Sequence, residues 1–90
     1  MNFEWDSEKA EDNFSKHGVS FEEASTAFGD LLSSTIHDPD HSEDEDRFVL
    51  VGMTHVGRLV VVVHTDRGEA VRLINARLAE PRERKAYEDA

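Results

Sequence analysis

Residues 47–77, RFVLVGMTHVGRLVVVVHTDRGEAVRLINAR, decide the fold of this chain, because three runs rich in Val, Leu and Ile are separated there by short breaks. Such runs predict β-strands. The three strands are expected over residues 47–55, 58–65 and 70–77. The breaks at 56–57 and 66–69 have the length of hairpin loops, so each strand should run antiparallel to the one before it. The sequence therefore predicts an antiparallel meander.

Two short helices are expected before the meander. Asp6 is placed to cap the first helix, and Gly18 is placed to stop it. Ser20 is placed to cap the second helix, with Glu23 three residues later in a capping box. Gly29 ends this second helix. Both helices are amphipathic and need the sheet to bury their apolar sides.

Three further segments complete the expected fold. Alternating Ser, Thr and Ile over residues 31–36 indicate an edge strand, and residues 37–46 form a polar, acidic loop. Pro81 suits the first position of a last helix that ends near Asp89. The sequence thus predicts one α+β domain over residues 1–90. In it, two N-terminal helices pack on an antiparallel sheet of about four strands, followed by a C-terminal helix.

Composition excludes several classes of protein. The 90 residues contain no cysteine, which removes disulfides and thiolate metal sites, and no basic segment followed by an apolar one resembles a signal peptide. The longest apolar run, residues 59–63, is far shorter than the ~20 residues that span a bilayer. We therefore expect a cytoplasmic protein that makes no membrane contact.

The net charge of -10 argues against a nucleic-acid partner, because proteins that bind nucleic acids present basic surfaces to phosphates. The charge is uneven, however. Most of the acid lies in residues 1–46, and a set of basic residues follows it: Arg58, Arg67, Arg72, Arg77, Arg82, Arg84 and Lys85. A local basic site is therefore compatible with an acidic chain. The acid excess either keeps the protein soluble or limits non-specific contact with nucleic acid, and both interpretations stay open.

Hairpin geometry predicts which charged side chains lie together. A two-residue loop at 56–57 places His55 opposite Arg58, and a loop over 66–69 places Arg58 opposite Arg77. Two facing arginines repel each other unless an anion lies between them. The row therefore indicates either a phosphate site or pairing with carboxylates of the last helix, and the residues alone favour neither.

The same register divides the apolar side chains between two faces. The face that is expected to seat the two helices carries Phe48, Leu50, Leu59, Val61, Val63, Ile74 and Ala76. The other face carries the row of His55 and the two arginines and stays partly open.

No pattern points to a metal ion or a cofactor. The loop that begins at Asp38 starts like a calcium-binding loop, but Glu43 stands where that loop needs glycine. His37 and His41 flank a proline in a loop, so their spacing of four does not place them on one helix face. We therefore expect neither a metal site nor a cofactor.

Two groups of side chains have a structural and a chemical interpretation. Glu83, Arg84 and Tyr87 share one face of the last helix, where a tyrosine commonly packs the helix onto a sheet. Trp5, beside Phe3, is more often a core residue than a platform for a nucleic-acid base. In both groups the structural interpretation is preferred.

Several short stretches together resemble a known family, although each of them alone is a weak motif. They are Phe3-Glu4-Trp5-Asp6, residues 16–24 (KHGVSFEEA), His41-Ser42 with Glu45-Asp46-Arg47, residues 57–62 (GRLVVV), and Ala76-Arg77 followed by Glu83-Arg84 and Tyr87. In this order and spacing they span nearly the whole chain, and the chain resembles the BrnT family of ribonuclease toxins.

The resemblance implies a RelE-like fold and metal-independent RNA cleavage that stops translation. It also implies neutralisation by a DNA-binding antitoxin of the ribbon-helix-helix or a similar kind, and contact with operator DNA only through that antitoxin. Both a homodimer and a heterotetramer with the antitoxin stay open.

Metal-independent RNA cleavage needs a base for the 2′-hydroxyl, cations around the phosphate and a proton donor for the leaving oxygen. The resemblance matches Arg58 and Arg77 to family positions and assigns both to the phosphate. The predicted catalytic residues are these two with Lys16 as a further cation and Glu83 and Tyr87 for proton transfer.

Two departures from the family pattern bear on activity. His55 stands at a variable position, so it is left outside the predicted site. Residues 76–82 are less basic than expected, which favours a reduced affinity for RNA. The alternative function is therefore a catalytically decayed protein that binds the antitoxin or regulates its own operon.

Overall fold

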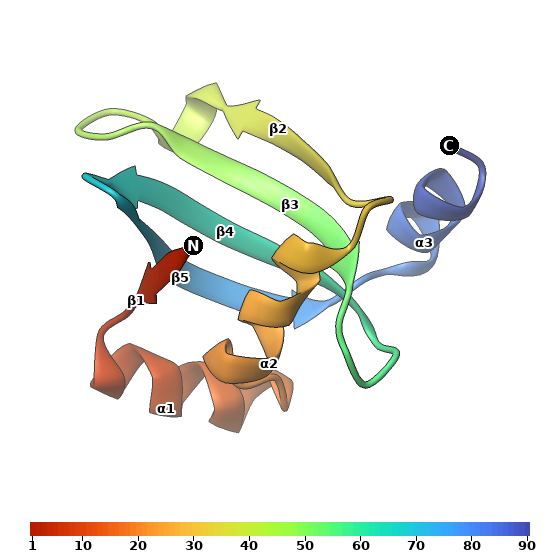
Figure 1. The fold of residues 1–90 in the computed structure, drawn as a ribbon, viewed down its shortest axis with the longest axis horizontal. Helices are drawn as coiled ribbons and strands as arrows, with labels where there is room; N and C mark the ends of the chain where they lie inside the picture. The colour runs from red at the N-terminus through yellow and green to blue at the C-terminus, as the bar shows by residue number, and fades with distance from the viewer.

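A five-stranded mixed sheet forms the centre of the computed structural model, which describes residues 1–90 (Figure 1). Its strands are β1 (Asn2–Glu4), β2 (Ser34–Asp38), β3 (Arg47–Met53), β4 (Leu59–Arg67) and β5 (Ala70–Leu78). They lie in the order β1-β5-β4-β3-β2. The meander from β3 to β5 is antiparallel, as the sequence predicts, and the α+β class is confirmed.

The prediction of an antiparallel sheet of about four strands is wrong at one edge. β1 pairs in parallel with the first three residues of β5, which adds a fifth strand and makes the sheet mixed. A segment of three residues is too short to show the alternation that predicts a strand. At the other edge, β2 begins at Ser34 rather than at residue 31, and it runs antiparallel to β3.

The helices start and stop close to their predicted positions. They are α1 (Ser7–His17), α2 (Phe21–Thr26) continued by the 3-10 turn η1 (Ala27–Gly29), the 3-10 turn η2 (Pro39–His41) and α3 (Pro81–Glu88). The Asp6 carboxylate caps α1, and Gly18 ends it with a φ of 68°. The Ser20 hydroxyl accepts a hydrogen bond from the Glu23 N–H at 3.0 Å. The Glu23 carboxylate does not complete the predicted capping box, because other side chains bind it.

The first hairpin has a three-residue loop, and the two-residue loop predicted at 56–57 is wrong. The Thr54 N–H donates to the Arg58 carbonyl at 2.8 Å, so these two residues close the loop. His55 therefore does not face Arg58. Because a shift of one residue exchanges the two faces of a strand, β4 is turned over. The side chains that face the helices are Val60 and Val62, where Leu59, Val61 and Val63 were predicted.

The second hairpin also departs from the prediction, and the expected opposition of Arg58 and Arg77 is wrong. β4 and β5 stay paired as far as Arg67, and a bulge after Val63 shifts their register. Arg77 consequently pairs with Val61. Since Val61 points away from α1 and α2, Arg77 lies on the opposite face of the sheet from Arg58.

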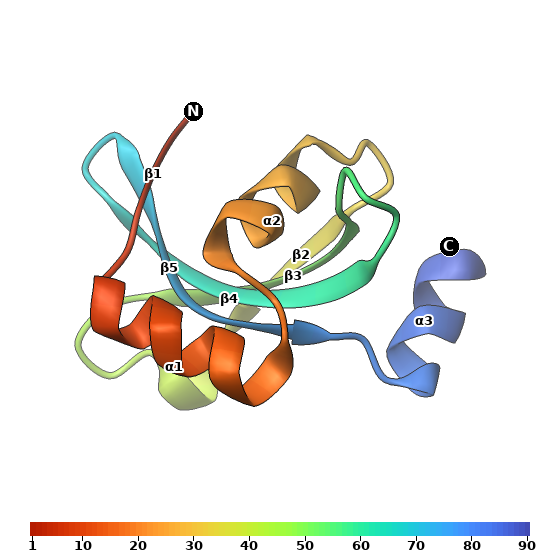
Figure 2. The ribbon, with the colours of Figure 1, turned by 90° about the horizontal axis from the view of Figure 1, so that it is seen from below.

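The hydrophobic core lies between α1, α2 and one face of the sheet (Figure 2). Its buried residues are Val19, Phe21, Ala24, Ala27, Leu50, Val60, Val62, Leu73 and Ala76. Trp5 packs against this core with its ring centroid 5.9 Å from that of Phe21, which confirms its structural interpretation. The core fixes α2 against the sheet and so places the residues that follow β3.

One amide side chain fastens α1 to β5. Asn13 is 5% exposed, and its Nδ2 donates to the Ala76 carbonyl at 2.8 Å while its Oδ1 accepts from the Ala76 N–H at 3.0 Å. The same Nδ2 donates to the Val19 carbonyl at 3.0 Å. Asn13 thus takes the place of a neighbouring strand along the part of β5 that β1 does not reach.

α3 lies apart from α1 and α2, beyond the end of β5 (Figure 2). It packs against β3. None of the helices combines the length and the apolar character that a membrane crossing requires.

Candidate functional site

The two ends of the sheet differ in their content of basic residues. Asp38 pairs with Arg47, and Glu45 contacts Arg67 at 3.7 Å, so the β2–β3 loop and the β4–β5 hairpin lie together. These two loops hold eight of the 20 acidic residues: Asp38, Asp40, Glu43, Asp44, Glu45, Asp46, Asp66 and Glu69. The opposite end holds six of the ten basic residues: Lys16, Arg58, Arg77, Arg82, Arg84 and Lys85. The predicted site residues all lie toward this second end.

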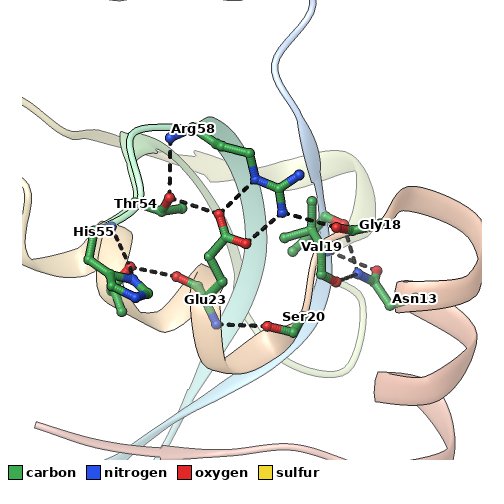
Figure 3. Close-up of polar contacts among 10 residues, drawn as sticks. Asn13, Gly18, Val19, Ser20, Glu23, Thr54, His55 and Arg58 are labelled. Carbon is green, nitrogen blue, oxygen red and sulfur yellow. Dashed lines mark hydrogen bonds and ion pairs between the residues drawn. The ribbon is translucent and has the colours of Figure 1, made fainter.

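Arg58 joins three segments at that end (Figure 3). Its Nε donates to Glu23 Oε2 at 2.9 Å, and its Nη2 donates to Glu23 Oε1 at 2.5 Å. The same Nη2 donates to the Gly18 carbonyl at 3.0 Å, at the end of α1. Thr54 adds a hydroxyl that donates to Glu23 Oε2 at 2.8 Å. Arg58 is therefore held by α1, α2 and the loop that follows β3.

The Arg58–Glu23 pair is fixed in its charged form. The hydrogen bonds from Arg58, and then that from Thr54, hold the pKa of Glu23 below its ordinary value despite burial. Glu23 in turn raises the pKa of Arg58. The Glu23 side chain is 13% exposed and that of Arg58 is 37% exposed. A phosphate that approaches Arg58 from solvent therefore meets a guanidinium whose fork is already occupied.

Arg77 forms a second bidentate pair on the other face of the sheet. Its Nη1 and Nη2 donate to the two carboxylate oxygens of Glu83 at 2.8 and 2.9 Å. Glu83 Oε1 also accepts from the Glu80 N–H at 2.8 Å and completes a capping box at the start of α3. The guanidinium lowers the pKa of Glu83, and Glu83 raises that of Arg77. The predicted alternative, a carboxylate partner from the last helix, is confirmed for Arg77.

Tyr87 anchors α3 to the turn before β2. Its hydroxyl donates to Asp30 Oδ2 at 2.5 Å, and the same oxygen accepts from the Met53 N–H at 2.8 Å. The hydrogen bond to Asp30 raises the pKa of Tyr87 and lowers that of Asp30. Tyr87 and Glu83 line one hollow of about 170 Å³, with Leu32, Ser34, Val51, Ala86 and Ala90. The structural interpretation of Tyr87 is confirmed, and its phenol stays protonated at neutral pH.

Lys16 lies in the last turn of α1, beside the edge of β5. It lines a hollow of about 190 Å³ with His17 and Asn75, among other residues. Asn75 is two residues before Arg77 on β5, and Gly18, two residues after Lys16, binds Arg58. Lys16 therefore lies at the β5 edge, near the end of α1 that binds Arg58, and belongs to neither arginine pair.

The histidines of the acidic loop are each bound to a carboxylate. His37 Nε2 lies 3.0 Å from Asp46 Oδ1, and His41 Nδ1 lies 2.8 Å from Asp38 Oδ2. No group of three or more His, Asp or Glu side chains is arranged to hold a metal ion.

Comparison with known proteins decides the family. A family model described as the ribonuclease toxin BrnT of type II toxin-antitoxin systems matches residues 5–83. The chain belongs to the BrnT family. The 1.1 Å crystal structure of the Brucella abortus ribonuclease toxin BrnT is similar in fold, with a TM-score of 0.66. Its sequence is 28% identical, and the match covers 89% of this chain and 97% of that one. No curated protein matches this chain.

The BrnT assignment confirms the resemblance and identifies the chain as a ribonuclease toxin of a type II toxin-antitoxin system, which implies an antitoxin partner. The matched range includes Lys16, Arg58, Arg77 and Glu83 and ends before Tyr87. The structure brings Arg77, Glu83 and Tyr87 together at one end of the sheet, whereas Arg58 lies at the same end on the opposite face. The catalytic roles of these residues remain predictions.

Sequence reasoning missed three residues that organise the candidate BrnT site. The sequence predicts Glu23 only as a helix-capping residue, although it lies within the matching stretch at 16–24. Thr54 gave no signal, because the predicted hairpin left it inside a strand. Asp30 and Tyr87 are 57 positions apart, so no local pattern joins them.

Proposed function

We propose that this chain is an endoribonuclease that cleaves RNA without a metal ion and so inhibits translation. A cognate DNA-binding antitoxin, of the ribbon-helix-helix or a similar kind, neutralises it and carries the complex to operator DNA. The observation that supports the chemistry best is the group of Arg77, Glu83 and Tyr87, which supplies a cation, a carboxylate and a phenol at one end of the sheet.

The protonation states of this group suit general acid–base cleavage at neutral pH. Arg77 lowers the pKa of Glu83 from 4.5 and Asp30 raises the pKa of Tyr87 from 10.0, so at neutral pH Glu83 is ionised and Tyr87 keeps its proton. These contacts also weaken Glu83 as a base and Tyr87 as an acid, so both have to loosen when RNA binds. In the proposed reaction, Glu83 takes the proton of the RNA 2′-hydroxyl and the 2′-oxygen attacks phosphorus. The bond from phosphorus to the 5′-oxygen breaks, and Tyr87 gives its proton to that oxygen. The products are a 2′,3′-cyclic phosphate and a free 5′-hydroxyl.

The cations act on the phosphate in this proposal. Arg77 exchanges part of its contact with Glu83 for the non-bridging phosphate oxygens and stabilises their negative charge. That exchange also frees Glu83 to accept a proton. Lys16 and Arg58 lie toward the same end of the sheet and attract the neighbouring phosphates of the strand.

The test is cleavage of a labelled RNA in excess chelator, first without and then with ribosomes. Removal of a charge that stabilises the transition state typically costs on the order of 10²-fold in rate, so Arg77→Ala should lose at least that much. Arg84→Ala is the matched control, because the Arg84 side chain is 48% exposed and forms one ion pair, with Glu88 at 3.9 Å. Thermal unfolding verifies that both variants fold. Equal cleavage by both variants would overturn the proposed role of Arg77.

One observation favours the alternative, a non-catalytic antitoxin-binding protein. Both family-matched arginines are occupied by glutamates of the same chain, Glu23 and Glu83. If that occupation is permanent, neither guanidinium reaches RNA. Expression without antitoxin separates the two functions: a ribonuclease arrests growth and Arg77→Ala relieves the arrest. A decayed toxin arrests growth in neither form.

A further inference from the structure

The two edges of the sheet are protected to very different extents. At the β5 edge, β1 pairs with the first three residues, and Asn13 binds both backbone groups of Ala76. At the other edge, β2 pairs with β3 on one side and with no strand on its outer side. An unprotected edge presents unpaired N–H and C=O groups that can accept a strand from another chain.

The first four residues of β2 lack the features that usually prevent such pairing, and Asp38 at its end carries the one carboxylate of the strand. The strand contains no proline or lysine, and its first four residues are exposed. Ile36 is 64% exposed in the middle of the strand, and Leu31 and Leu32 just before it are 99% and 72% exposed. An aliphatic edge of this kind is typical of a surface that a partner covers.

The side chains of β2 continue the face of the sheet on which α3 lies. Ser34 pairs with Val51 and Ile36 pairs with Val49, and both valines point away from the core. Leu32 and Ser34 line the mostly apolar hollow of about 170 Å³ that also contains Glu83 and Tyr87. A strand added beside β2 would therefore place alternate side chains next to this hollow.

The negative charge of the chain favours a basic partner at this edge. The acidic loop from Asp38 to Asp46 follows β2 directly, and the whole chain carries a net charge of -10. A second copy of the chain would bring together two chains that each carry this charge, which is unfavourable. A basic partner is attracted instead, and a protein that also binds DNA phosphates presents basic residues.

We propose that a strand of the antitoxin pairs with β2, with an apolar side chain in the hollow beside Glu83 and Tyr87 and basic residues facing the acidic loop. This inference rests on the proposed function, since it assigns a surface to the antitoxin named there. It also supplies a means of neutralisation. The added strand covers the side of the Arg77, Glu83 and Tyr87 group that opens toward β2.

The test uses the antitoxin encoded beside this chain, purified after co-expression and titrated against the folded toxin. Ile36→Lys places a charge at the middle of the edge and should weaken binding at least about tenfold. Val56→Lys is the matched control, because Val56 is 59% exposed in the β3–β4 loop and the change of charge is the same. That variant should bind within about twofold of the wild type.

Hydrogen exchange tests the mode of binding, because strand pairing protects backbone amides that side-chain contact alone leaves exposed. The antitoxin should slow exchange within Ser34–Asp38. Equal binding of both lysine variants, or no added protection in β2, overturns the inference and leaves the proposed function intact. No binding to the wild type overturns antitoxin neutralisation itself. A toxin dimer that Ile36→Lys dissociates, with no antitoxin protection at β2, assigns the edge to a second copy and overturns the inference.

Discussion

The Arg58–Glu23 and Arg77–Glu83 pairs share one chemistry but join different parts of the molecule. Arg58 and Glu23 are 35 positions apart, and their contact ties α2 to the start of β4 and the end of α1. Arg77 and Glu83 are six positions apart and tie only α3 to the strand before it. The first pair closes the fold, whereas the second fixes the angle of one terminal helix.

This difference affects which arginine can exchange its glutamate partner for a phosphate of RNA. To release Arg58, its hydrogen bonds to Glu23 and to the Gly18 carbonyl have to break, and these join segments that are distant in sequence. The Thr54–Glu23 hydrogen bond is disturbed with them. To release Arg77, its hydrogen bonds to Glu83 and to the Leu78 carbonyl have to break, and these lie within residues 77–83. Arg58 is therefore chiefly an architectural residue, and we propose that a phosphate displaces Arg77 from its glutamate more readily.

The largest expected effect on stability comes from breaking the architectural pair. Glu23→Ala removes the acceptor of two guanidinium hydrogen bonds and of the Thr54 hydroxyl. We expect the free energy of unfolding to fall by about 1–2 kcal/mol, the lower part of the usual range for charged hydrogen bonds, because solvent reaches the pair. Urea denaturation measures the loss. The exposed neighbour Glu22 provides the control, since Glu22→Ala should change stability by less than about 0.5 kcal/mol.

A smaller and more local effect is expected from the second pair. Glu83→Ala removes the partner of Arg77 and the side chain that caps the Glu80 N–H. Loss of a helix cap costs about 0.5–1 kcal/mol, and here the loss should fall on α3 alone. Hydrogen exchange should therefore speed up in Pro81–Glu88 while the urea midpoint hardly moves. If Glu83→Ala lowered the free energy of unfolding as much as Glu23→Ala does, the second pair would stabilise the whole fold and not α3 alone.

The smallest expected effect is on the pH dependence of stability, which distinguishes the glutamates of both pairs from a buried histidine. The pKa values of Glu23 and Glu83 are lowered, so their stabilisation is present above the ordinary value of 4.5 and is lost as the pH falls through the lowered values. Burial lowers the pKa of His64 from 6.5, so the folded state favours its neutral form and loses stability as the pH falls below 6.5.

His64 contacts the rings of Phe28 and Phe48, and neither of its ring nitrogens has a hydrogen-bond partner. His64→Leu should therefore flatten the stability profile just below pH 6.5 and leave the acid limb below pH 4.5 unchanged. Unfolding followed at several pH values gives both limbs in one experiment. An unchanged slope just below pH 6.5 in this variant would show that another group titrates there.

Local chemistry made the helices and strands predictable, but not the register between strands. Asp6, Gly18 and Ser20 act within one turn of chain, and each does what its type predicts. In β4, by contrast, residues 59–63 are all apolar, and Leu59 to Val62 are buried on both faces. No alternation marks the inner face of such a strand, so a loop longer by one residue turned it over.

The candidate site was predictable in its residue types and not in its contacts. The family resemblance selected both arginines and Glu83, and the last helix brought Arg77 its carboxylate as one interpretation allowed. The contacts of Glu23 and Asp30 were not predictable, because their partners come from segments that are distant in sequence. Which carboxylate binds a given arginine depends on the tertiary fold, and sequence spacing carries no information about it.

The amide of Asn13 has a consequence for the order of events during synthesis. It joins the first helix to a strand residue 63 positions later, and β1 likewise needs β5 as its partner. Contacts so distant in sequence form late, because the intervening chain has to be made and closed into a loop first. On the ribosome, α1 therefore cannot form its contact with β5 until β5 emerges. A nascent chain therefore lacks both contacts until residues 70–76 have been translated.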